Sequence, residues 1–534
     1  MPNNEKLNEA KYFAESFDLP SPSLRSYYGR VVQGQPDVYR TTFYKGKDVT
    51  QILREWMPHL EVLKEKWPTL VEFENDLAKK VGPMSVMKPL KERMDDIDSY
   101  YDSITLESKP INDDAIAAVI NEWKCARGMR IRGQARTVSL MQKSTNSGSP
   151  YFTKRRRVIE RTLPATVSQN GLSTIQYLDG KPYHACAILG WRGQEGGPKP
   201  TDVKQRVVWM FPFAVNVAEL QVYQPLIETA QRFNLVPAWV SMDAVDREIT
   251  QLFDTKQPSD LVVCTDFSKF DQHFNPHMSD CSKTILQSIF TDNDESRRWF
   301  NEVFPIKYNI PLAYDWERVR FGQHGMGSGS GGTNADETLT HRALQYEAAL
   351  GNHAKLNPHS QCLGDDGILS YPGITVEDVT RSYSRHGQDM NLDKQYASTD
   401  DCTYLRRWHH KDYRIGGVCV GVYSTARALG RLAEQERYYD PEVWSKEMVA
   451  LRQLSILENV KYHPLREEFV DYCMKGDKYR LGLDIPGFID NIAAVAKQAT
   501  DYMPDFLGYT KSMQKGADTG IAGWWIVNYL KSKA

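Results

Sequence analysis

The segment Gln361-Cys362-Leu363-Gly364-Asp365-Asp366-Gly367-Ile368-Leu369 places two adjacent carboxylates between two short apolar runs. The runs are too short for helices, and glycine on each side of the carboxylates permits a tight turn, so the segment predicts a hairpin of buried strands. Asp365 and Asp366 would then lie together at its tip. Adjacent carboxylates repel each other and are tolerated in water or around a cation such as Mg²⁺, which prefers oxygen ligands. Taken alone, such a turn is equally typical of an ordinary protein surface.

A second pair of carboxylates follows another predicted strand. The apolar run Leu261-Val262-Val263-Cys264 leads through Thr265 to Asp266, and Asp271 follows five residues later. A strand end can direct Asp266 into a cleft, and the turn beyond it can return Asp271 to the same side. The spacing alone is common, so the order of this pair and the hairpin carries the information.

The composition is that of a large folded protein. The chain has 534 residues, of which 41% are hydrophobic and 25% charged, and a formal net charge of −2. These values exclude a small binding module, a disordered chain and a globally basic surface that wraps nucleic acid. Eight scattered cysteines without a C-x-x-C pattern argue against a zinc module or a disulfide framework and favour a reducing compartment. We find neither a secretory leader nor an apolar run near the ~20 residues of a membrane span.

Glycine occupies six of the eleven positions from Gly322 to Gly332. The segment 327–332 formally matches the dinucleotide-binding pattern G-x-G-x-x-G. That interpretation requires an acidic residue about 20 positions later, where this chain has glycine and asparagine after a long helical pattern, so we reject it. A glycine loop that brings the backbone close to a polymer or nucleotide fits better. We expect Thr333 to cap the helix that follows, with Asp336 completing a capping box.

Helical patterns flank this central region. The first 65 or so residues predict an N-terminal extension, and residues 113–127 have one apolar helix face formed by Ile116, Val119, Ile120 and Trp123. After about residue 412 the pattern becomes mostly helical. There Asp440-Pro441 indicates a helix start, with Trp444, Met448 and Leu451 on one face behind it.

In order and spacing, the central pieces resemble the catalytic motifs of viral RNA-dependent RNA polymerases. Asp266 and Asp271 resemble motif A, Ser328-Gly329 with Thr333 resembles motif B, and Gly364-Asp365-Asp366 resembles motif C. Four further segments complete the set: residues 145–150 are similar to motif G, 204–208 to motif F, 391–394 to motif D and 404–407 to motif E. The length of the chain and the sequence of residues 330–337 most resemble the polymerases of picobirnaviruses. The genome of these viruses consists of two double-stranded RNA segments. The motifs cover about half of the chain.

The resemblance implies an α+β protein shaped as a closed right hand, with an antiparallel palm sheet and a helical thumb. Residues 1–65 would form an N-terminal extension that bridges fingers and thumb. The expected ranges are 66–205 and 277–324 for the fingers, 206–276 and 325–411 for the palm, and 412–534 for the thumb and C-terminal tail.

The resemblance also implies a role for each motif residue. Asp266, Asp365 and Asp366 would hold two Mg²⁺ ions, for which Mn²⁺ can substitute, and Lys394 would be the general acid for the leaving pyrophosphate. Asp271 would bind the ribose 2′-hydroxyl. The other implied nucleotide-binding residues are Arg206, Lys204, Ser328, Gly329, Thr333 and Asn334. The implied template or primer contacts are Thr145, Ser147, Gly148, Arg155, Arg156, Arg157, Arg406 and Arg407.

One position departs from the family pattern, because Glu337 stands where many relatives have the motif B asparagine. We expect Glu337 to be a structural carboxylate in the first helical turn, directed toward the helix terminus. Asn334 or Ser328 are the alternatives for the missing ribose contact.

Three other groupings have two interpretations each. His273, His277 and Cys281 recur at every fourth position, but Pro276 interrupts that helix, so a structural role is favoured over a metal site. The cluster 154–157 (Lys-Arg-Arg-Arg) is either a solvated face or a template contact, and its place after motif G favours the template. The tail 523–527, which contains two tryptophans, is more typical of core packing than of a segment near the cleft.

The resemblance predicts an RNA-directed RNA polymerase that replicates and transcribes a viral RNA genome by two-metal transfer of nucleotides from NTPs. The alternatives are a reverse transcriptase, which usually has a bulky side chain where Asp271 stands, and a noncatalytic RNA-binding protein associated with a capsid. Expected partners are an RNA template and nascent strand, NTPs and a viral capsid protein. We expect a monomer located in the virion interior and the host cytoplasm.

Overall fold

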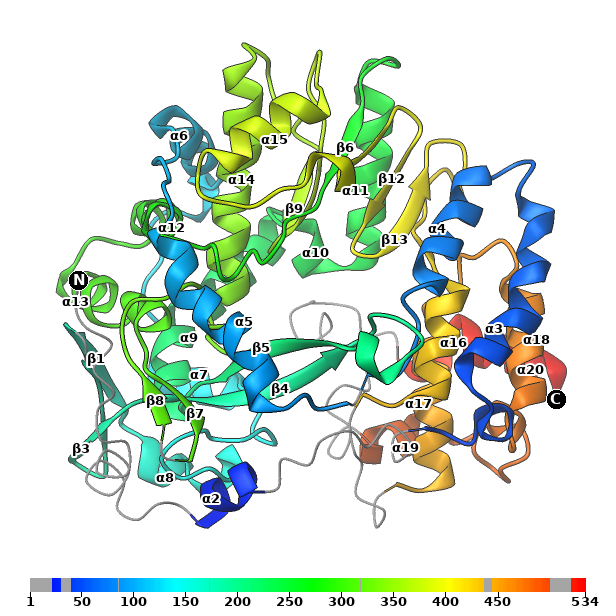
Figure 1. Cartoon of the computed structure of the whole chain (residues 1–534), viewed down its shortest axis with the longest axis horizontal. Coiled ribbons are helices and arrows are strands. Elements are labelled where there is room, and N and C mark those ends of the chain that lie inside the picture. The colour runs from blue at the N-terminus through cyan, green and yellow to red at the C-terminus, as the bar shows by residue number, and fades with distance from the viewer. Residues whose placement is uncertain are drawn as a thin grey trace.

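The computed structural model describes residues 22–29, 40–84, 86–171, 173–316, 318–436, 444–499 and 520–534. Three groups of elements surround the centre of the molecule and correspond to the predicted palm, fingers and thumb (Figure 1). Palm and fingers contain both strands and helices, whereas the thumb is mostly helical, with the short strand β14 (Val422–Tyr423). The predicted α+β right-hand architecture is therefore confirmed.

The palm is built on a four-stranded antiparallel sheet of order β11-β6-β10-β9. Helix α14 contacts β9 and packs against helices α6, α12 and α15. β6 is buried along its whole length, which explains its uninterrupted apolar sequence. The palm strands are β6 (Val262–Thr265), β9 (Gln361–Leu363), β10 (Asp366–Leu369) and β11 (Tyr396–Ser398). The helices are α6 (Asp113–Glu122), α11 (Met242–Thr255), α12 (Pro276–Ile289), α14 (Thr333–Gly351) and α15 (Val376–Ser384). The strand before Asp266, the two strands of the predicted hairpin and the helix predicted within 113–127 are confirmed.

The fingers contain two sheets and share one hydrophobic core with the palm. In the sheet of order β5-β4-β7-β8, strand β7 pairs parallel to β4 and antiparallel to β8. The long helix α9 (Phe213–Phe233) contacts α7 (Gln134–Leu140) and strands β1 and β2. The strands of the fingers are β1 (Thr166–Asn170), β2 (Ser173–Leu178), β3 (Lys181–His184), β4 (Ala187–Gln194), β5 (Lys204–Met210), β7 (Leu312–Asp315) and β8 (Arg318–Arg320).

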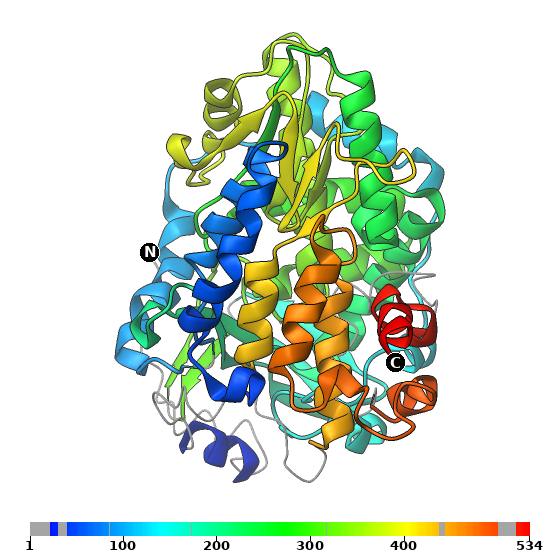
Figure 2. The same cartoon turned by 90° about the vertical axis from the view of Figure 1, so that its right-hand side faces the viewer.

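The thumb packs around a second hydrophobic core, and its helices stand side by side in Figure 2. Its helices are α16 (Thr425–Ala433), α17 (Lys446–Glu458), α18 (Arg466–Gly476), α19 (Ile492–Ala499) and α20 (Trp525–Lys533). Helix α17 begins at Lys446, with Ser445 as its N-cap, and the predicted start at Asp440-Pro441 lies outside the described residues. Trp524, Ile526 and Val527 are buried in this core, so the core interpretation of the tail is confirmed.

The N-terminal segment joins the fingers to the thumb. Leu24 of α2 (Pro22–Gly29) packs into the fingers, whereas helices α3 (Val49–Trp56) and α4 (Pro68–Ala78) belong to the thumb core. Glu74 on α4 accepts hydrogen bonds from the backbone N–H groups of Thr425 (2.8 Å) and Ala426 (3.1 Å), and thus caps α16. α4 lies in the range predicted for the fingers but packs on the thumb. α6 and α12 lie in ranges predicted for the fingers but pack against α14 of the palm, and α9 lies in the range predicted for the palm but contacts β1 and β2 of the fingers. The exact domain boundaries stay a prediction.

The hand is closed by the β4–β5 hairpin, which reaches across to α16 (Figure 1). At its tip Glu195 accepts a hydrogen bond from Arg427 of α16 at 2.8 Å, and Arg192 pairs with Glu436.

The structure also bears on the predictions for the cysteines and for membrane spans. All eight cysteines are unpaired thiols, so there is no disulfide framework, and no helix in the described segments is long and apolar enough to cross a membrane.

Candidate active site

The three predicted metal ligands lie at one edge of the palm sheet. β6 and β10 run antiparallel with Thr265 opposite Gly367, so Asp266, directly after β6, lies beside the tip of the β9–β10 hairpin. The hairpin turns at Gly364, whose φ of 58° is a conformation that glycine adopts without steric cost. Strand pairing therefore brings Asp266 to the same edge as the adjacent carboxylates at 365 and 366.

A buried histidine supports this hairpin from helix α14. The Nδ1 atom of His341 lies 2.8 Å from the carbonyl oxygen of Gly364, and a Cβ atom at Gly367 would lie only 2.6 Å from its ring. Burial lowers the pKa of His341 to about 4, so the ring is neutral and can donate from Nδ1. The sequence analysis missed His341, because helical periodicity does not reveal which buried side chain meets the hairpin.

The clustered carboxylates perturb one another. Burial raises the pKa of Asp365, and the negative charges of Asp271 and Asp266 raise it further. Burial and the charge of Asp365 raise the pKa of Asp366 to about 7. Asp366 is held by the backbone N–H of Leu405, which donates to its Oδ2 atom at 2.8 Å. The hairpin is thus tied to the predicted motif E.

These carboxylates suit a divalent cation. Asp266 and Asp365 reach solvent although the surrounding protein partly desolvates them, and all three side chains offer the hard oxygen donors that Mg²⁺ prefers. A cation bound between them would offset the repulsion that raises their pKa values. The described residues contain no preassembled group of three or more His, Cys, Asp or Glu ligands, so the carboxylates would have to converge on the ion.

The His273, His277 and Cys281 grouping is not a metal centre in the described structure. Nδ1 of His273 lies 2.7 Å from the carbonyl oxygen of Lys269, and Nδ1 of His277 lies 2.9 Å from Oγ of Ser108. Pro276 is the first residue of α12, so His273 precedes the helix. These contacts fit the structural interpretation, which stays a prediction.

Gln395 holds the end of β6 against motif D. Its Oε1 atom accepts a hydrogen bond from the N–H of Asp266 at 2.7 Å, and its Nε2 atom donates to the carbonyl of Asp266 at 2.8 Å. The clamp places the neighbouring Lys394 close enough to lower the pKa of Asp266, which burial raises. Gln395 was also missed, although its position directly after Lys394 was the available signal.

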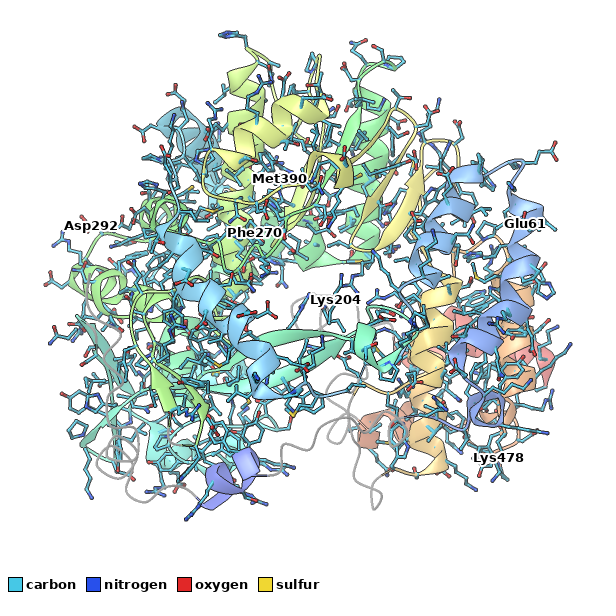
Figure 3. All side chains as sticks on the ribbon, viewed as in Figure 1. Glu61, Lys204, Phe270, Asp292, Met390 and Lys478 are labelled. Atoms are coloured by element: carbon cyan, nitrogen blue, oxygen red, sulfur yellow. The ribbon has the colours of Figure 1, made fainter. Side chains whose placement is uncertain are left out.

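Cations on the fingers face these carboxylates. Lys204 and Arg206 are exposed on β5, and Lys204 lies near the middle of the molecule in Figure 3. The charge of Lys204 lowers the pKa of Asp266, and the charge of Arg206 lowers the pKa values of Asp271 and Asp365, in each case against the effect of burial. The site therefore has a carboxylate side and a cationic side.

The glycine loop 327–332 packs directly against β5. Oγ of Ser328 accepts a hydrogen bond from the N–H of Trp209 at 3.2 Å. A Cβ atom at Gly329 would lie 1.6 Å from the carbonyl oxygen of Trp209, so only glycine fits there. Oγ1 of Thr333 donates to the carbonyl of Gly327 at 3.0 Å, and Oδ1 of Asn334 accepts from Nε1 of Trp239 at 2.8 Å. The predicted motif B side chains are thus largely engaged within the protein.

The predicted capping box is wrong. Gly332 occupies the N-cap of α14 and no side chain caps the helix, because Thr333 bonds the loop instead. Asp336 is fully buried and forms an ion pair with Lys307 at 3.0 Å. It also accepts hydrogen bonds from the hydroxyls of Tyr223 and Tyr308, both at 2.7 Å.

The position predicted for Glu337 is also wrong. Glu337 is only 4% exposed, and its carboxyl group faces that of Asp271 instead of pointing to the helix terminus. Burial and the charges of Asp271 and Asp365 raise the pKa of Glu337 well above its ordinary value. The pKa of Glu337 is the more strongly raised of the two, so we expect Glu337 to keep its proton and to donate to Asp271.

The segment 145–148, which the resemblance predicts to contact the template, is anchored to the start of α9. The N–H of Phe213 donates to the carbonyl of Ser147 at 2.8 Å, and the carbonyl of Thr145 accepts from the N–H of Arg155 at 3.0 Å. Gly148 has a φ of 63°, and a Cβ atom there would lie 2.5 Å from the carbonyl oxygen of Phe211. These contacts attach the segment to the fingers.

The predicted RNA-contacting arginines differ in their surroundings. Arg155 is half-buried and bonds protein groups, whereas Arg156 and Arg157 are exposed and remain candidates for template contact. Arg406 is also partly exposed, 3.8 Å from Glu195. Arg407 cannot serve as an RNA contact, because its guanidinium is buried in an ion pair with Asp246 at 2.8 Å.

We expect the double substitution Arg156→Gln and Arg157→Gln to weaken RNA binding and to flatten its dependence on salt. Each phosphate contact to single-stranded RNA contributes roughly 0.7 to the slope of log affinity against log salt, so the slope should fall by about 1.4. Titrations at several salt concentrations measure it. Arg297→Gln with Arg298→Gln, on α13 (Asp294–Glu302) at the outer edge of the fingers, removes the same charge as a control. Equal slopes in wild type and the Arg156/Arg157 variant would make that pair a solvated face.

Comparisons with known proteins agree with this geometry. The sequence profile of the family described as "Viral RNA-dependent RNA polymerase" matches residues 125–420. A protein named "Potential RNA-dependent RNA polymerase" from Human picobirnavirus (strain Human/Thailand/Hy005102/-) is 63% identical over 527 residues, which span 98% of each chain.

Solved structures of the same kind superpose closely on this chain. The crystal structure of the RNA-dependent RNA polymerase of a human picobirnavirus is 63% identical, with a TM-score of 0.94, and covers 98% of this chain and 99% of the other. The insertion loop deletion mutant of such a polymerase is 61% identical with a TM-score of 0.92 over the same shares. Sequence, structure and site geometry agree, and the chain therefore belongs to the viral RNA-dependent RNA polymerases.

Proposed function

We propose that this polymerase replicates and transcribes a viral RNA genome by adding nucleotides from NTPs to the 3′-hydroxyl of a growing RNA strand. The observation that carries the proposal is the shared position of Asp266 and Asp365 at one edge of the palm sheet. Lys204 and Arg206 of the fingers act on these carboxylates from the other side of the site. Such an arrangement suits a triphosphate held between cations of the protein and cations bound by carboxylates.

Two Mg²⁺ ions, for which Mn²⁺ can substitute, would be held by Asp266 and Asp365. Asp366 would contribute from the position in which Leu405 holds it. When bound, such ions lower the pKa of the attacking hydroxyl and offset the charge of the leaving group.

The chain's own residues would bind and orient the reactants. Lys204 and Arg206 would bind the triphosphate, because their exposed charges face the carboxylates. Lys394, which Gln395 places beside Asp266, would donate a proton to the departing pyrophosphate. Asp271 would accept a hydrogen bond from the ribose 2′-hydroxyl, the group that distinguishes RNA precursors from DNA precursors.

A Mg²⁺-dependent incorporation assay with the full chain on a single-stranded RNA template tests this proposal. We expect ribonucleotides to be incorporated, deoxyribonucleotides to be rejected and activity to be lost in excess chelator. Efficient DNA synthesis on the RNA template would indicate a reverse transcriptase. RNA binding without any incorporation would indicate a noncatalytic capsid-associated protein.

The remaining partners and the location belong to the same proposal. A monomer that acts inside the virion and in the host cytoplasm, in contact with capsid protein, would match the picobirnavirus relationship. Light scattering of the purified chain tests the monomer, and co-purification with virus particles tests the location and the capsid contact.

A further inference from the structure

The glycine loop 327–332 depends on other parts of the protein for its conformation. Four of its six residues are glycines, whose backbone adopts many conformations at similar energy. Its own side chains are those of Ser328 and Ser330 only. Hydrogen bonds from outside the loop must therefore select one arrangement.

Glu219 on helix α9 supplies several of these bonds. Its side chain is completely buried, its Oε1 atom accepts from the N–H of Gly331 at 3.1 Å, and its Oε2 atom accepts from the hydroxyl of Ser330. Burial raises its pKa, although nearby Lys307 acts in the opposite direction. A buried carboxylate is stable only when it is hydrogen-bonded, so the loop and Glu219 stabilise each other.

Asn216, one turn earlier on α9, extends the contact in two directions. Its Nδ2 atom donates to Oε1 of Glu219 and to the carbonyl of Gly329, both at 3.1 Å. Its Oδ1 atom accepts from Nη2 of Arg155 at 2.9 Å. Arg155 also donates to the carbonyl of Gln142 at 3.2 Å and lies over the ring of Phe213.

We propose that Arg155, Asn216 and Glu219 form a positioning relay that holds the glycine loop in register with residues 145–157, the segment that contains the predicted template contacts. The inference rests on the proposed function, which places the template at one end of the relay and the nucleotide at the other. Arg155 directly precedes Arg156 and Arg157 in the short helix Arg155–Arg157. RNA phosphates bound to Arg156 and Arg157 would therefore affect the position of Arg155 and, through it, the relay. None of the three relay residues needs to touch the reacting atoms.

The competing interpretation is that these residues only stabilise the fold. The two interpretations predict different behaviour of the glycine loop when a substitution removes the hydrogen bonds of Arg155 or Asn216. A purely stabilising residue lowers the melting temperature, but the loop and the kinetics of the folded enzyme stay unchanged. A positioning residue changes the loop in a protein that is still folded.

Hydrogen exchange of the loop amides tests the relay without relying on catalysis. We expect Asn216→Ala and Arg155→Gln each to speed exchange in the 327–332 peptide by about tenfold or more, because the loop loses the contacts that hold it closed. The matched control is Gln224→Ala on the same helix, which loses a hydrogen bond to the carbonyl of Thr137 and one from Arg132, neither of which involves the loop. Unchanged loop exchange in the Arg155 and Asn216 variants, or equal acceleration in the control, overturns the proposal.

Kinetics of the folded variants test the consequence for synthesis. Asn216→Ala and Glu219→Ala should lower kcat for nucleotide addition by about 10–100-fold, as expected for lost positioning, while RNA affinity changes little. Glu219→Gln keeps the shape and an acceptor oxygen, so it should restore kcat to within about threefold of wild type. Wild-type kcat in Glu219→Ala, or no rescue by glutamine, contradicts the relay. A wild-type protein that synthesises no RNA would refute the proposed function, whereas the exchange result would still decide the relay.

Discussion

Replacing Asp365 or Asp266 with alanine is expected to abolish RNA synthesis while leaving the fold intact. A bound metal ion contributes several kcal/mol of charge stabilisation in the transition state, and about 1.4 kcal/mol corresponds to tenfold, so kcat/KM should fall by more than about 10³-fold. Nearby carboxylates cannot compensate, because Asp366 is already bonded to the backbone of Leu405. Primer extension or de novo synthesis with a labelled nucleotide measures the loss.

The fold should survive because both side chains are exposed at the ends of strands. Removing one carboxylate also relieves the repulsion that raises the pKa of its neighbour, so melting without divalent ions should be unchanged or slightly higher. Asp292→Ala, at an exposed position on the outer edge of the fingers, is the control and should synthesise RNA normally. Wild-type incorporation by a folded Asp266 or Asp365 variant would refute the assignment of these residues as metal ligands.

The sequence predicts the parts of this site that depend on local chain geometry. A short buried strand followed by a carboxylate, and a glycine-flanked pair in a hairpin, have strong local signals. Asp266, Asp365 and Asp366 consequently lie where they were predicted. Antiparallel pairing of the two strands was expected from the family resemblance.

The errors concern polar side chains whose partners are distant in sequence. Asp336 and Glu337 look like first-turn residues of an exposed helix, but α14 is buried on almost every side, so both carboxyl groups point into the protein. Arg407 lies in a basic motif, yet its partner Asp246 is 161 positions earlier. The pattern of the local sequence does not reveal such pairings, because they arise only when separate elements pack together.

The buried carboxyl pair affects stability in a way that depends on pH. Glu337 has a raised pKa in the folded protein, so it keeps a proton that it would lose in the unfolded chain. Its contribution to stability is complete below the ordinary glutamate pKa and declines as the pH rises through the raised folded value. Glu337→Gln cannot ionise, so we expect its stability relative to wild type to increase with pH. Melting temperatures without divalent ions measure this difference, and parallel pH profiles would contradict a shared proton.

The same pair predicts how the enzyme selects ribonucleotides. Asp271→Ala should lower the preference for GTP over dGTP by about 10–100-fold, because a hydrogen bond to a charged group contributes roughly 1.5–3 kcal/mol. Glu337→Gln should keep that preference to within about threefold, since an amide N–H can donate to Asp271 as the protonated carboxyl does. Glu337→Ala removes the donor and leaves Asp271 unsupported, so selectivity should fall toward that of Asp271→Ala. Incorporation efficiencies for the matched nucleotides separate the cases, and lost selectivity in Glu337→Gln with normal selectivity in Asp271→Ala would transfer the ribose contact to Glu337.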